Sequence, residues 1–425
     1  MHRHDALCQY HRDIMEILKQ KTALIINIGD ELLAGHTLNT NACWMSSELR
    51  KIGVYVTKHL VIADEEEAIV SVLDQLDNSV NYIFITGGLG PTDDDKTKAI
   101  ITEYFGGELV FSEEVFADLI LFFKKRSKIP SESNREQAFI PNNAERIMNY
   151  KGTASGMIFS KDNKKYYVMP GIPYEMKSMM KESILPALAK NASPTEFCYE
   201  VNVFGLPESY IADQIKKNFP KELTQVKIAY YPSLEGITIR LNSCVEENTK
   251  DLQLKISHLL GKAVFSHSGE SLESIFVNLC IAKKLTVSCA ESCTGGRMAD
   301  MITSVPGSSQ ILNESYITYS NEAKQRLLGV PESILQAYGA VSEETVTAML
   351  KGLFNKTNAD LCIAASGIAG PGGGTVDKPV GLVYIGVKYY HKIIIQKIVY
   401  DRGRKNNKEY AARAALNIAR LLISE

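Results

Sequence analysis

The sequence predicts an α/β protein with more than one domain, for two reasons. Its 425 residues exceed the size at which a single hydrophobic core usually stops growing. Apolar strand patterns also alternate with helix patterns through most of the chain, and this order is typical of parallel sheets with helices on both faces. We therefore expect two or three domains, each with its own core.

Strand and helix patterns alternate in the N-terminal part, which predicts a parallel sheet covered by helices. The expected strands span residues 23–28, 54–62, 82–85 and 166–169, and the expected helices span residues 39–49, 65–76 and 96–104, with another beginning near Tyr174. Segments 29–31, 86–97 and 170–173 each follow a strand. Ligands of such sheets bind beyond the carboxyl ends of the strands, so we expect one binding site where these segments meet.

Segment 86–97, TGGLGPTDDDKT, is the strongest local signal. Gly87, Gly88 and Gly90 allow backbone N–H groups to approach an anion closely, and the helix that begins near Thr97 adds the positive end of its dipole. Three consecutive carboxylates would repel a bare phosphate unless a divalent cation lies between them. We therefore expect a phosphate site with a divalent metal cation; the alternative is an acidic loop with a helix N-cap.

The rest of the chain predicts two further units. Residues 195–262 suit a small α+β domain without a catalytic cluster, with strands at 197–203, 227–230 and 236–241 and helices at 208–219 and 246–260. From about residue 271 the pattern is α/β again, with several antiparallel strands. Its expected helices span 272–283, 323–328, 343–354 and 409–423, and its expected strands span 285–289, 311–318, 361–365, 382–388 and 392–400.

The composition and charge are those of a soluble globular protein and exclude several partners. Hydrophobic residues make up 45% and charged residues 23% of the chain. The net charge of -2, without a basic face or an aromatic-basic motif, gives no sign of nucleic-acid binding. No window resembles a membrane span and residues 1–20 lack the apolar stretch of a signal peptide, so we expect a cytoplasmic protein without a membrane partner.

Eight cysteines are present, but none forms a Cys-x-x-Cys pair and no histidine cluster accompanies them. This pattern argues against a zinc site and favours a reducing compartment. Most of these cysteines are expected to be small buried hydrophobes. Cys293 is the exception, because it lies in the hydroxyl- and glycine-rich segment 290–296.

Four segments rich in hydroxyls and glycine occur in the third unit, at residues 290–296, 306–309, 316–324 and 366–375. Each alone is typical of a turn. Three of them lie at strand ends, however, and long glycine loops commonly let a ligand touch the backbone. We therefore expect a second site here, with substrate contacts from Thr294, Gly295, Ser366 and Gly367.

Lys324 is the candidate base of this second site. A serine nucleophile needs an activating base, and His391 falls in a strand pair remote from the glycine loops, which makes a Ser-His-acid triad a poor fit. A lysine can serve if burial or nearby positive charge lowers its pKa, and Tyr319 could relay a proton or orient the amine. The pattern fits a Ser-Lys amidohydrolase that requires no cofactor; the alternative is a solvated lysine among capping serines.

Seven motifs resemble, in the same order, those of the CinA family of competence/damage-inducible proteins. They are IGDELLAGHTLNTNA (28–42), TGGLGPTDDDKT (86–97), MPGIPYEM (169–176), AESCTGG (290–296), TYSNEAKQRLLGV (318–330), GAVSEE (339–344) and SGIAGPGGGT with KPVGLVYIG (366–386). The resemblance runs from about Lys21 to the C-terminus and leaves residues 1–20 outside it.

The resemblance implies a molybdopterin-binding-like three-layer α/β/α domain at residues 21–190, a small α+β domain at 191–265 and an α/β CinA domain at 266–425, after an extension at 1–20. The C-terminal domain is similar to amidases that convert nicotinamide mononucleotide to nicotinate mononucleotide and ammonia. The N-terminal domain resembles metal-dependent ADP-ribose pyrophosphatases. Both activities would recycle pyridine nucleotides, and family members of this length are typically homodimers.

The resemblance also assigns roles to single residues. Ser309 and Lys324 match the positions taken for the amidase nucleophile and base, Tyr319 matches the supporting tyrosine, and Ser292 is the rival nucleophile. Thr294 and Ser366 match hydroxyls that line the same pocket.

Two further assignments concern charged residues. The family usually has Gly-Asp-Arg before the last helix, where this chain has Arg402-Gly-Arg404. Arg404 is therefore the better candidate to bind the phosphate of the mononucleotide, and Arg402 is the other. In the N-terminal domain, Asp94 and Asp95 are the metal candidates.

A binding module is the main rival to an enzyme. In that reading the chain binds a nucleotide or a pterin, partners proteins of competence or the DNA-damage response, and has lost catalysis. The combination of Lys324, Tyr319 and Ser309 favours an active enzyme.

Overall fold

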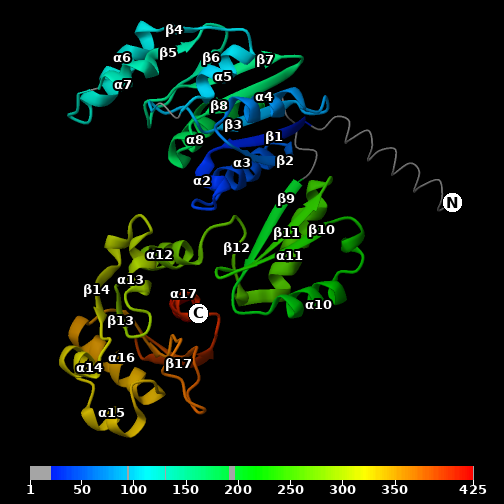
Figure 1. Ribbon diagram of the computed structural model, residues 1–425. Helices are drawn as coiled ribbons and strands as arrows, with labels where there is room; N and C mark the ends of the chain where they lie inside the picture. Colours follow the sequence, from blue (N-terminus) through cyan, green and yellow to red (C-terminus); the bar gives the residue numbers. More distant parts are fainter. Residues whose placement is uncertain (1–20, 93–94, 130, 191–196, 425) are drawn as a thin grey trace, which may run out of the picture. The chain divides into compact units, whose positions relative to one another are not determined.

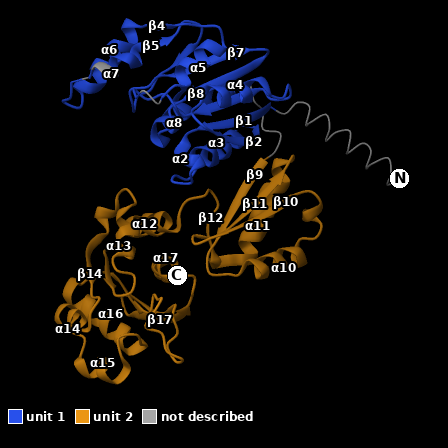
Figure 2. Cartoon of the chain, viewed as in Figure 1, with its two compact units in different colours: residues 1–196 blue, residues 197–425 orange. Residues whose placement is uncertain are grey.

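The computed structural model describes residues 21–92, 95–129, 131–190 and 197–424. The chain divides into two compact units, residues 1–196 and residues 197–425, and each is considered by itself (Figure 2). Figure 1 gives the element labels used below. The predicted extension at residues 1–20 lies outside the described residues.

A six-stranded mixed sheet forms the centre of the first unit. Its strands are β1 (Lys21–Ile28), β2 (Val54–Ile62), β3 (Tyr82–Thr86), β6 (Glu145–Ile147), β7 (Gly156–Lys161) and β8 (Lys164–Met169). Two further strands, β4 (Leu109–Phe111) and β5 (Phe139–Pro141), form a separate two-stranded sheet. The order in the large sheet is β2-β1-β3-β8-β7-β6. The first four strands are parallel, whereas β7 and β6 add an antiparallel edge that the sequence patterns did not reveal.

Helices cover both faces of this sheet, as predicted for a three-layer domain. They are α2 (Asp30–Leu33), α3 (Thr40–Lys51), α4 (Glu66–Asp74), α5 (Thr97–Tyr104), α6 (Glu113–Lys124), α7 (Glu132–Arg135), η1 (Glu136–Ala138), α8 (Pro173–Met179), η2 (Met180–Ile184) and α9 (Leu185–Ala189). Successive residues of β1 point to opposite faces: Ile25 packs with residues of α3 and α8, and Ile26 packs with residues of α4 and α5.

The second unit begins with an antiparallel sheet of four strands. These are β9 (Phe197–Val203), β10 (Lys227–Ser233), β11 (Gly236–Ser243) and β12 (Val264–Ser266), and the accompanying helices are α10 (Glu208–Asn218), η3 (Glu222–Thr224), α11 (Glu246–Leu260) and η4 (Gly261–Ala263). The sheet order is β10-β11-β9-β12. Val201 and Ile239 pack with Ile256 of α11 in one core, so alternate residues of β9 and β11 face away from these helices.

A second sheet, of five strands, follows in the same unit. Its strands are β13 (Val287–Glu291), β14 (Leu312–Ile317), β15 (Leu361–Gly367), β16 (Leu382–Tyr389) and β17 (Lys392–Val399), and its helices are α12 (Leu272–Lys283), α13 (Arg297–Thr303), η5 (Ser308–Gln310), α14 (Asn321–Leu328), α15 (Glu332–Tyr338), α16 (Glu343–Thr357) and α17 (Arg404–Ile423). The order is β14-β13-β15-β16-β17, with the first three strands parallel and the last two antiparallel.

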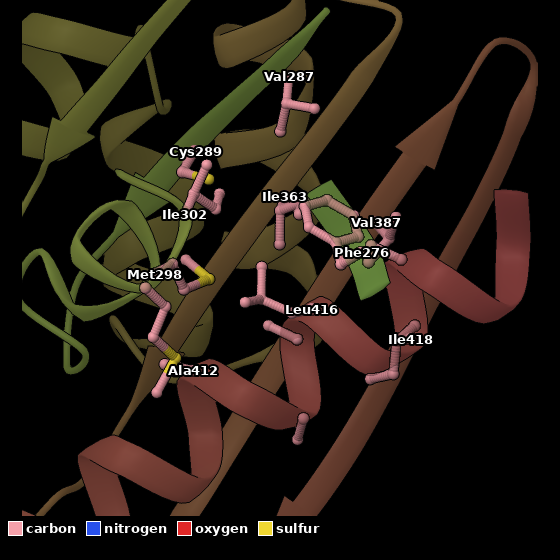
Figure 3. Close-up of a cluster of buried hydrophobic side chains, with 14 of the residues drawn as sticks. Phe276, Val287, Cys289, Met298, Ile302, Ile363, Val387, Ala412, Leu416 and Ile418 are labelled. Atoms are coloured by element: carbon pink, nitrogen blue, oxygen red, sulfur yellow. The ribbon is translucent and has the colours of Figure 1, made fainter. Parts of the chain in front are cut away.

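This five-stranded sheet also lies between helix layers. Leu416 of α17 packs in a core with Val287 and Ile363 (Figure 3), whereas Leu350 of α16 packs in another core with Ala364. The predicted mixture of parallel and antiparallel strands is therefore confirmed. Among the helices of the described residues, none combines the length and the apolar character needed to cross a membrane.

Candidate active site

Two parallel strands of the C-terminal sheet end side by side and place two serines together. Glu291 of β13 is in register with Ala365 of β15, and the N–H of Ser292 donates to the Ala365 carbonyl at 2.9 Å. Ser292 and Ser366 are the next residues after this pair, so both lie at the carboxyl edge of the sheet. The structure thus brings together two segments, 290–296 and 366–375, that the sequence analysis singled out.

Lys324 reaches the same edge from inside the protein. It follows β14, whose parallel partner is β13, and its side chain is 0% exposed. The Lys324 Nζ donates to the Ser292 Oγ at 3.0 Å and to the Thr318 carbonyl at 2.9 Å. In the described part of the chain no carboxylate forms an ion pair with this amine. The alternative of a solvated lysine is therefore wrong.

Burial gives this amine the character of a base. It lowers the pKa of Lys324, because desolvation disfavours the charged ammonium. Burial raises the pKa of the Cys293 thiol to about 12, so the thiol stays protonated. A neutral Lys324 can then accept the Ser292 proton across their 3.0 Å contact.

Ser309 lies at the other end of the sheet. It belongs to η5, before β14 begins, whereas Lys324 comes after β14 ends. Six strand residues separate the two edges, which corresponds to roughly 20 Å. Ser309 is exposed, and within the described ranges no hydrogen bond joins it to Lys324. The geometry therefore favours Ser292 as the nucleophile, which corrects the order in which the sequence analysis ranked the two serines.

Tyr319 and Arg404 meet at the exposed side of this edge. The Tyr319 side chain is 60% exposed, and its hydroxyl accepts a hydrogen bond from Arg404 at 2.9 Å. Only its backbone carbonyl approaches Lys324, at 3.4 Å. The predicted role of the Tyr319 side chain in orienting the amine is thus not seen. Arg404 also donates to the Gly370 carbonyl at 2.7 Å, whereas Arg402 is exposed and its N–H donates to Asn407.

The remaining predicted contacts fall into two groups. Ser366 donates to the Ala340 carbonyl at 2.6 Å, and a side chain on Gly367 would come within 2.5 Å of the Leu382 carbonyl. Both residues therefore serve the strand and the loop beside it. Thr294 is fully buried, and its hydroxyl has no partner among the described residues. The substrate contact expected of Thr294 stays a prediction.

The turn at Gly295 lies beside a cation that the sequence analysis missed. Gly295 has a φ of +58°, which favours glycine, and a side chain there would come within 3.3 Å of the Lys408 Nζ. Lys408 lies one turn after Arg404 on α17. The spacing of these two residues, four apart on one helix, is the signal that could have identified Lys408.

Replacing Lys324 by methionine is expected to stabilise the fold at neutral pH. The unfolded chain holds a proton on this lysine up to its ordinary pKa of 10.5, whereas the folded chain releases it at lower pH. The native fold therefore loses stability progressively as the pH falls from 10.5 to the lowered pKa, and below that pKa the loss stays constant. We expect Lys324→Met to add roughly 1 kcal/mol or more to the free energy of unfolding at pH 7.

Urea unfolding at pH 7 and pH 10 would measure this effect, with Lys351→Met on α16 as the matched control. The advantage of Lys324→Met should shrink at the higher pH. A variant that is less stable than the native chain at pH 7 would contradict the prediction.

The first unit has its own site at the carboxyl edge of its sheet. β1 lies between β2 and β3, so the strand order reverses beside it, and ligands bind at such reversals. A cavity of about 80 Å³ lies there, lined by Glu31, Asn41 and Thr86 among others. The Asn41 amide donates to the Gly171 carbonyl at 2.7 Å, while its Oδ1 is buried without a partner among the described residues. The sequence analysis did not single out Asn41 within its motif, because only the fold shows that its Oδ1 is buried without a partner among the described residues.

The predicted glycine turn adjoins this cavity. A side chain on Gly87 would lie 2.0 Å from the Ile28 carbonyl, and one on Gly88 would meet both Thr97 and Asp64. These positions therefore require glycine. The Thr97 hydroxyl donates to Asp64 at 3.0 Å, so the structure adds Asp64 to the predicted residues.

Carboxylates flank the turn, and the predicted metal there stays a prediction. The Asp95 Oδ2 accepts hydrogen bonds from the N–H and the hydroxyl of Thr92 and would lie 2.3 Å from a side chain on Gly90. Asp94 lies outside the described residues. Within the described ranges no three histidine, cysteine or acidic side chains converge. Two carboxylates with hydroxyls fit Mg²⁺, which keeps several waters and binds substrate phosphates as further ligands.

Comparisons with known proteins identify the family of this chain. The model of the CinA C-terminal domain matches residues 269–423, and the model of a probable molybdopterin binding domain matches residues 24–190. A protein of Clostridium beijerinckii, provisionally named a competence-damage inducible protein, is 38% identical over 407 residues, which cover 94% of this chain and 99% of the relative. The chain belongs to the CinA family.

Two further proteins are similar to this chain. A relative from Caldicellulosiruptor bescii, with the same provisional name, is 35% identical over 404 residues that cover 94% of this chain and 98% of the relative. A solved structure, the competence/damage inducible protein CihA from Agrobacterium tumefaciens, is 34% identical and covers 37% of this chain and 98% of its own, with a TM-score of 0.35.

A larger cavity in this CinA-family chain lies elsewhere. It has a volume of about 790 Å³ between α14, α15 and α16, and Leu327, Ile334 and Thr347 contribute to its wall. None of the predicted site residues lines it. We keep Lys324 and Ser292 as the candidate site of the C-terminal domain because a buried amine there contacts a serine hydroxyl.

Proposed function

We propose that the C-terminal domain hydrolyses the carboxamide of nicotinamide mononucleotide to the carboxylate and ammonia. One observation carries this proposal: a buried amine without an acidic partner in the described residues lies 3.0 Å from a serine hydroxyl. An amine with a lowered pKa beside a hydroxyl is the arrangement that activates serine without histidine. The choice of substrate rests on the family resemblance, and the serine–lysine mechanism rests on the contact between Ser292 and Lys324.

The reaction can be written with these residues. Neutral Lys324 takes the Ser292 proton while the Ser292 oxygen attacks the carboxamide carbon. The resulting ammonium gives this proton to the leaving nitrogen, so that ammonia departs and an acyl-enzyme remains. Water, deprotonated by the same amine, then attacks the acyl carbon, and the ammonium returns this proton to the Ser292 oxygen as the ester bond breaks and the carboxylate leaves. The unpartnered Thr294 hydroxyl is the candidate donor to the developing oxyanion.

Positive groups at the rim suit the phosphate of the substrate. Among the described residues, Arg404 bonds only neutral acceptors, the Tyr319 hydroxyl and the Gly370 carbonyl, so its charge is available to an anion. Lys408 adds a second cation beside Gly295. Incubating the purified chain with nicotinamide mononucleotide should release ammonia, with or without a chelator. A folded chain that releases none would refute the proposal.

The rival hypothesis, a binding module without catalysis, does not explain the buried lysine. Keeping a lysine fully buried without a carboxylate costs stability, and a module that only binds ligands has no need of this cost. Binding of nicotinamide mononucleotide without turnover, in both the native chain and Lys324→Ala, would support the module.

We propose that the N-terminal domain cleaves the pyrophosphate of ADP-ribose with the help of a divalent cation. A cation held between the carboxylates and the substrate would neutralise the charge of the phosphates. Asp64 and Asp95 would hold it, and the turn at Gly87 and Gly88 would bring backbone N–H groups to the phosphates. The unpartnered Asn41 oxygen would accept a hydrogen bond from the substrate.

Replacing Asp95 by asparagine is expected to lower the rate of ADP-ribose cleavage by at least about 100-fold, because a carboxylate ligand of the cation is lost. Product analysis for AMP and ribose phosphate, with and without a chelator, would measure it. Glu103→Gln, an exposed carboxylate on α5, is the matched control and should leave the rate unchanged. Ammonia release at the other site should be the same in both variants; cleavage that survives chelation would contradict the metal.

A further inference from the structure

The four-stranded sheet of the second unit carries a cavity that neither proposed reaction uses. The cavity has a volume of about 220 Å³ and lies on the sheet face opposite α11. Asn202 of β9 and Thr238 of β11 are in register on this face. Phe265 of β12 and Glu270, beyond it, complete the wall. An open sheet face is usually exposed to water, whereas Phe265 and Glu270 partly cover this one.

Asn202 shows that the cavity is prepared for a hydrogen-bond acceptor. It is only 5% exposed, and its Oδ1 accepts from the Thr238 hydroxyl at 2.8 Å. Its Nδ2 is buried and has no partner among the described residues. A buried N–H donor without an acceptor is costly, so most such groups in folded proteins find one. Asn202 is one of the residues that line the cavity, where a bound molecule can supply that acceptor.

The charges of the wall exclude two classes of ligand. Arg240 gives two hydrogen bonds to Glu200, at 2.8 and 3.1 Å, so the pair neutralises itself. Glu235 pairs with Arg413 at 3.6 Å, whereas Glu270 adds negative charge that opposes an anion. A metal ion is also a poor fit, because no three acidic, histidine or cysteine side chains converge in the part of the chain that the structure describes.

We propose that this cavity binds a neutral polyhydroxylated molecule of the size of one sugar ring. A hydroxyl can accept from the Asn202 amide and donate to Glu200 or Glu270 at the same time, which no simple cation or anion can do. Phe265 offers an apolar surface to the carbon face of such a ring. The volume is below the roughly 300–1,000 Å³ of sites for drug-sized ligands, which suits a monosaccharide.

Ligand-observed NMR titration of the full chain with D-ribose, D-glucose and D-galactose would test this proposal. We expect saturable binding of at least one sugar. Asn202→Asp keeps the oxygen that accepts from Thr238 but removes the N–H donor, so it should weaken binding at least tenfold. Asn242→Asp is the matched control: it adds the same charge to the same face of β11, outside the cavity, and should bind like the native chain.

Two results would overturn the proposal: no saturable binding of any of the three sugars, or equal affinities of Asn202→Asp and Asn242→Asp. Because Asn202 is buried, Glu270→Gln on the exposed rim provides a second variant that leaves the core intact. It should weaken binding at least threefold, and unchanged affinity would count against the proposal. Ammonia release from nicotinamide mononucleotide should be unchanged in all three variants, because the cavity is separate from that site.

Discussion

Replacing Lys324 by methionine is expected to lower kcat/KM for the deamidation of nicotinamide mononucleotide by at least about 10³-fold. The amine is the only described group that contacts the Ser292 hydroxyl, so the variant has no base for the nucleophile. Ammonia release under steady-state conditions measures the loss. Lys351→Met is the matched control for removing a lysine, and it should retain the native rate.

The pH dependence should identify the amine as the base. Lys324 acts when neutral, and burial lowers its pKa, so activity should rise with pH and level off below the ordinary value of 10.5. Lys324→Arg should be inactive at every pH, because a guanidinium keeps its proton. If Lys324→Met retained more than a tenth of the native activity, the amine would not be the base. The same variant should be more stable than the native chain at pH 7, which separates lost chemistry from lost folding.

Regular elements of the fold were predictable because their patterns are long. The expected strand 54–62 and helix 246–260 coincide with β2 and α11. The short strands β4 and β6, of three residues each, carry too few alternations to show a period. The antiparallel edge formed by β7 and β6 was missed for another reason: hydropathy does not state the direction in which a neighbouring strand runs.

The candidate site shows a different limit. Motif residues such as Ser292 and Lys324 could be identified from the sequence, but their pairing depends on which strands are neighbours. β13 and β14 are adjacent and parallel, so the residues after each strand meet. Ser309 precedes β14 and therefore falls at the opposite edge. Asn41 was not singled out within its motif and Asp64 lies in no motif. Only the buried Asn41 oxygen, which has no partner among the described residues, and the hydrogen bond from Thr97 to Asp64 set them apart.

Replacing Ser292 by alanine is expected to abolish deamidation, with a loss of at least about 10³-fold in kcat, whereas Ser309→Ala should remain within about threefold of the native rate. The two substitutions remove the same atom from two serines that the sequence ranks as rivals. They differ in geometry: Ser292 accepts from the Lys324 amine at 3.0 Å, and Ser309 lies beyond the amino end of β14.

A rapid-quench experiment would sharpen this comparison. An acyl-enzyme on Ser292 should appear as a covalent adduct of the native chain in mass spectrometry, and it should persist in Ser309→Ala but not in Ser292→Ala. Ser366→Ala tests whether any hydroxyl at this edge can substitute; its hydroxyl already donates to the Ala340 carbonyl, so it should not carry the adduct. An adduct on Ser309 would require Lys324 to act across the length of a β-strand, which a proton transfer cannot do. That result would therefore transfer the nucleophile to Ser309 and exclude Lys324 as its direct base.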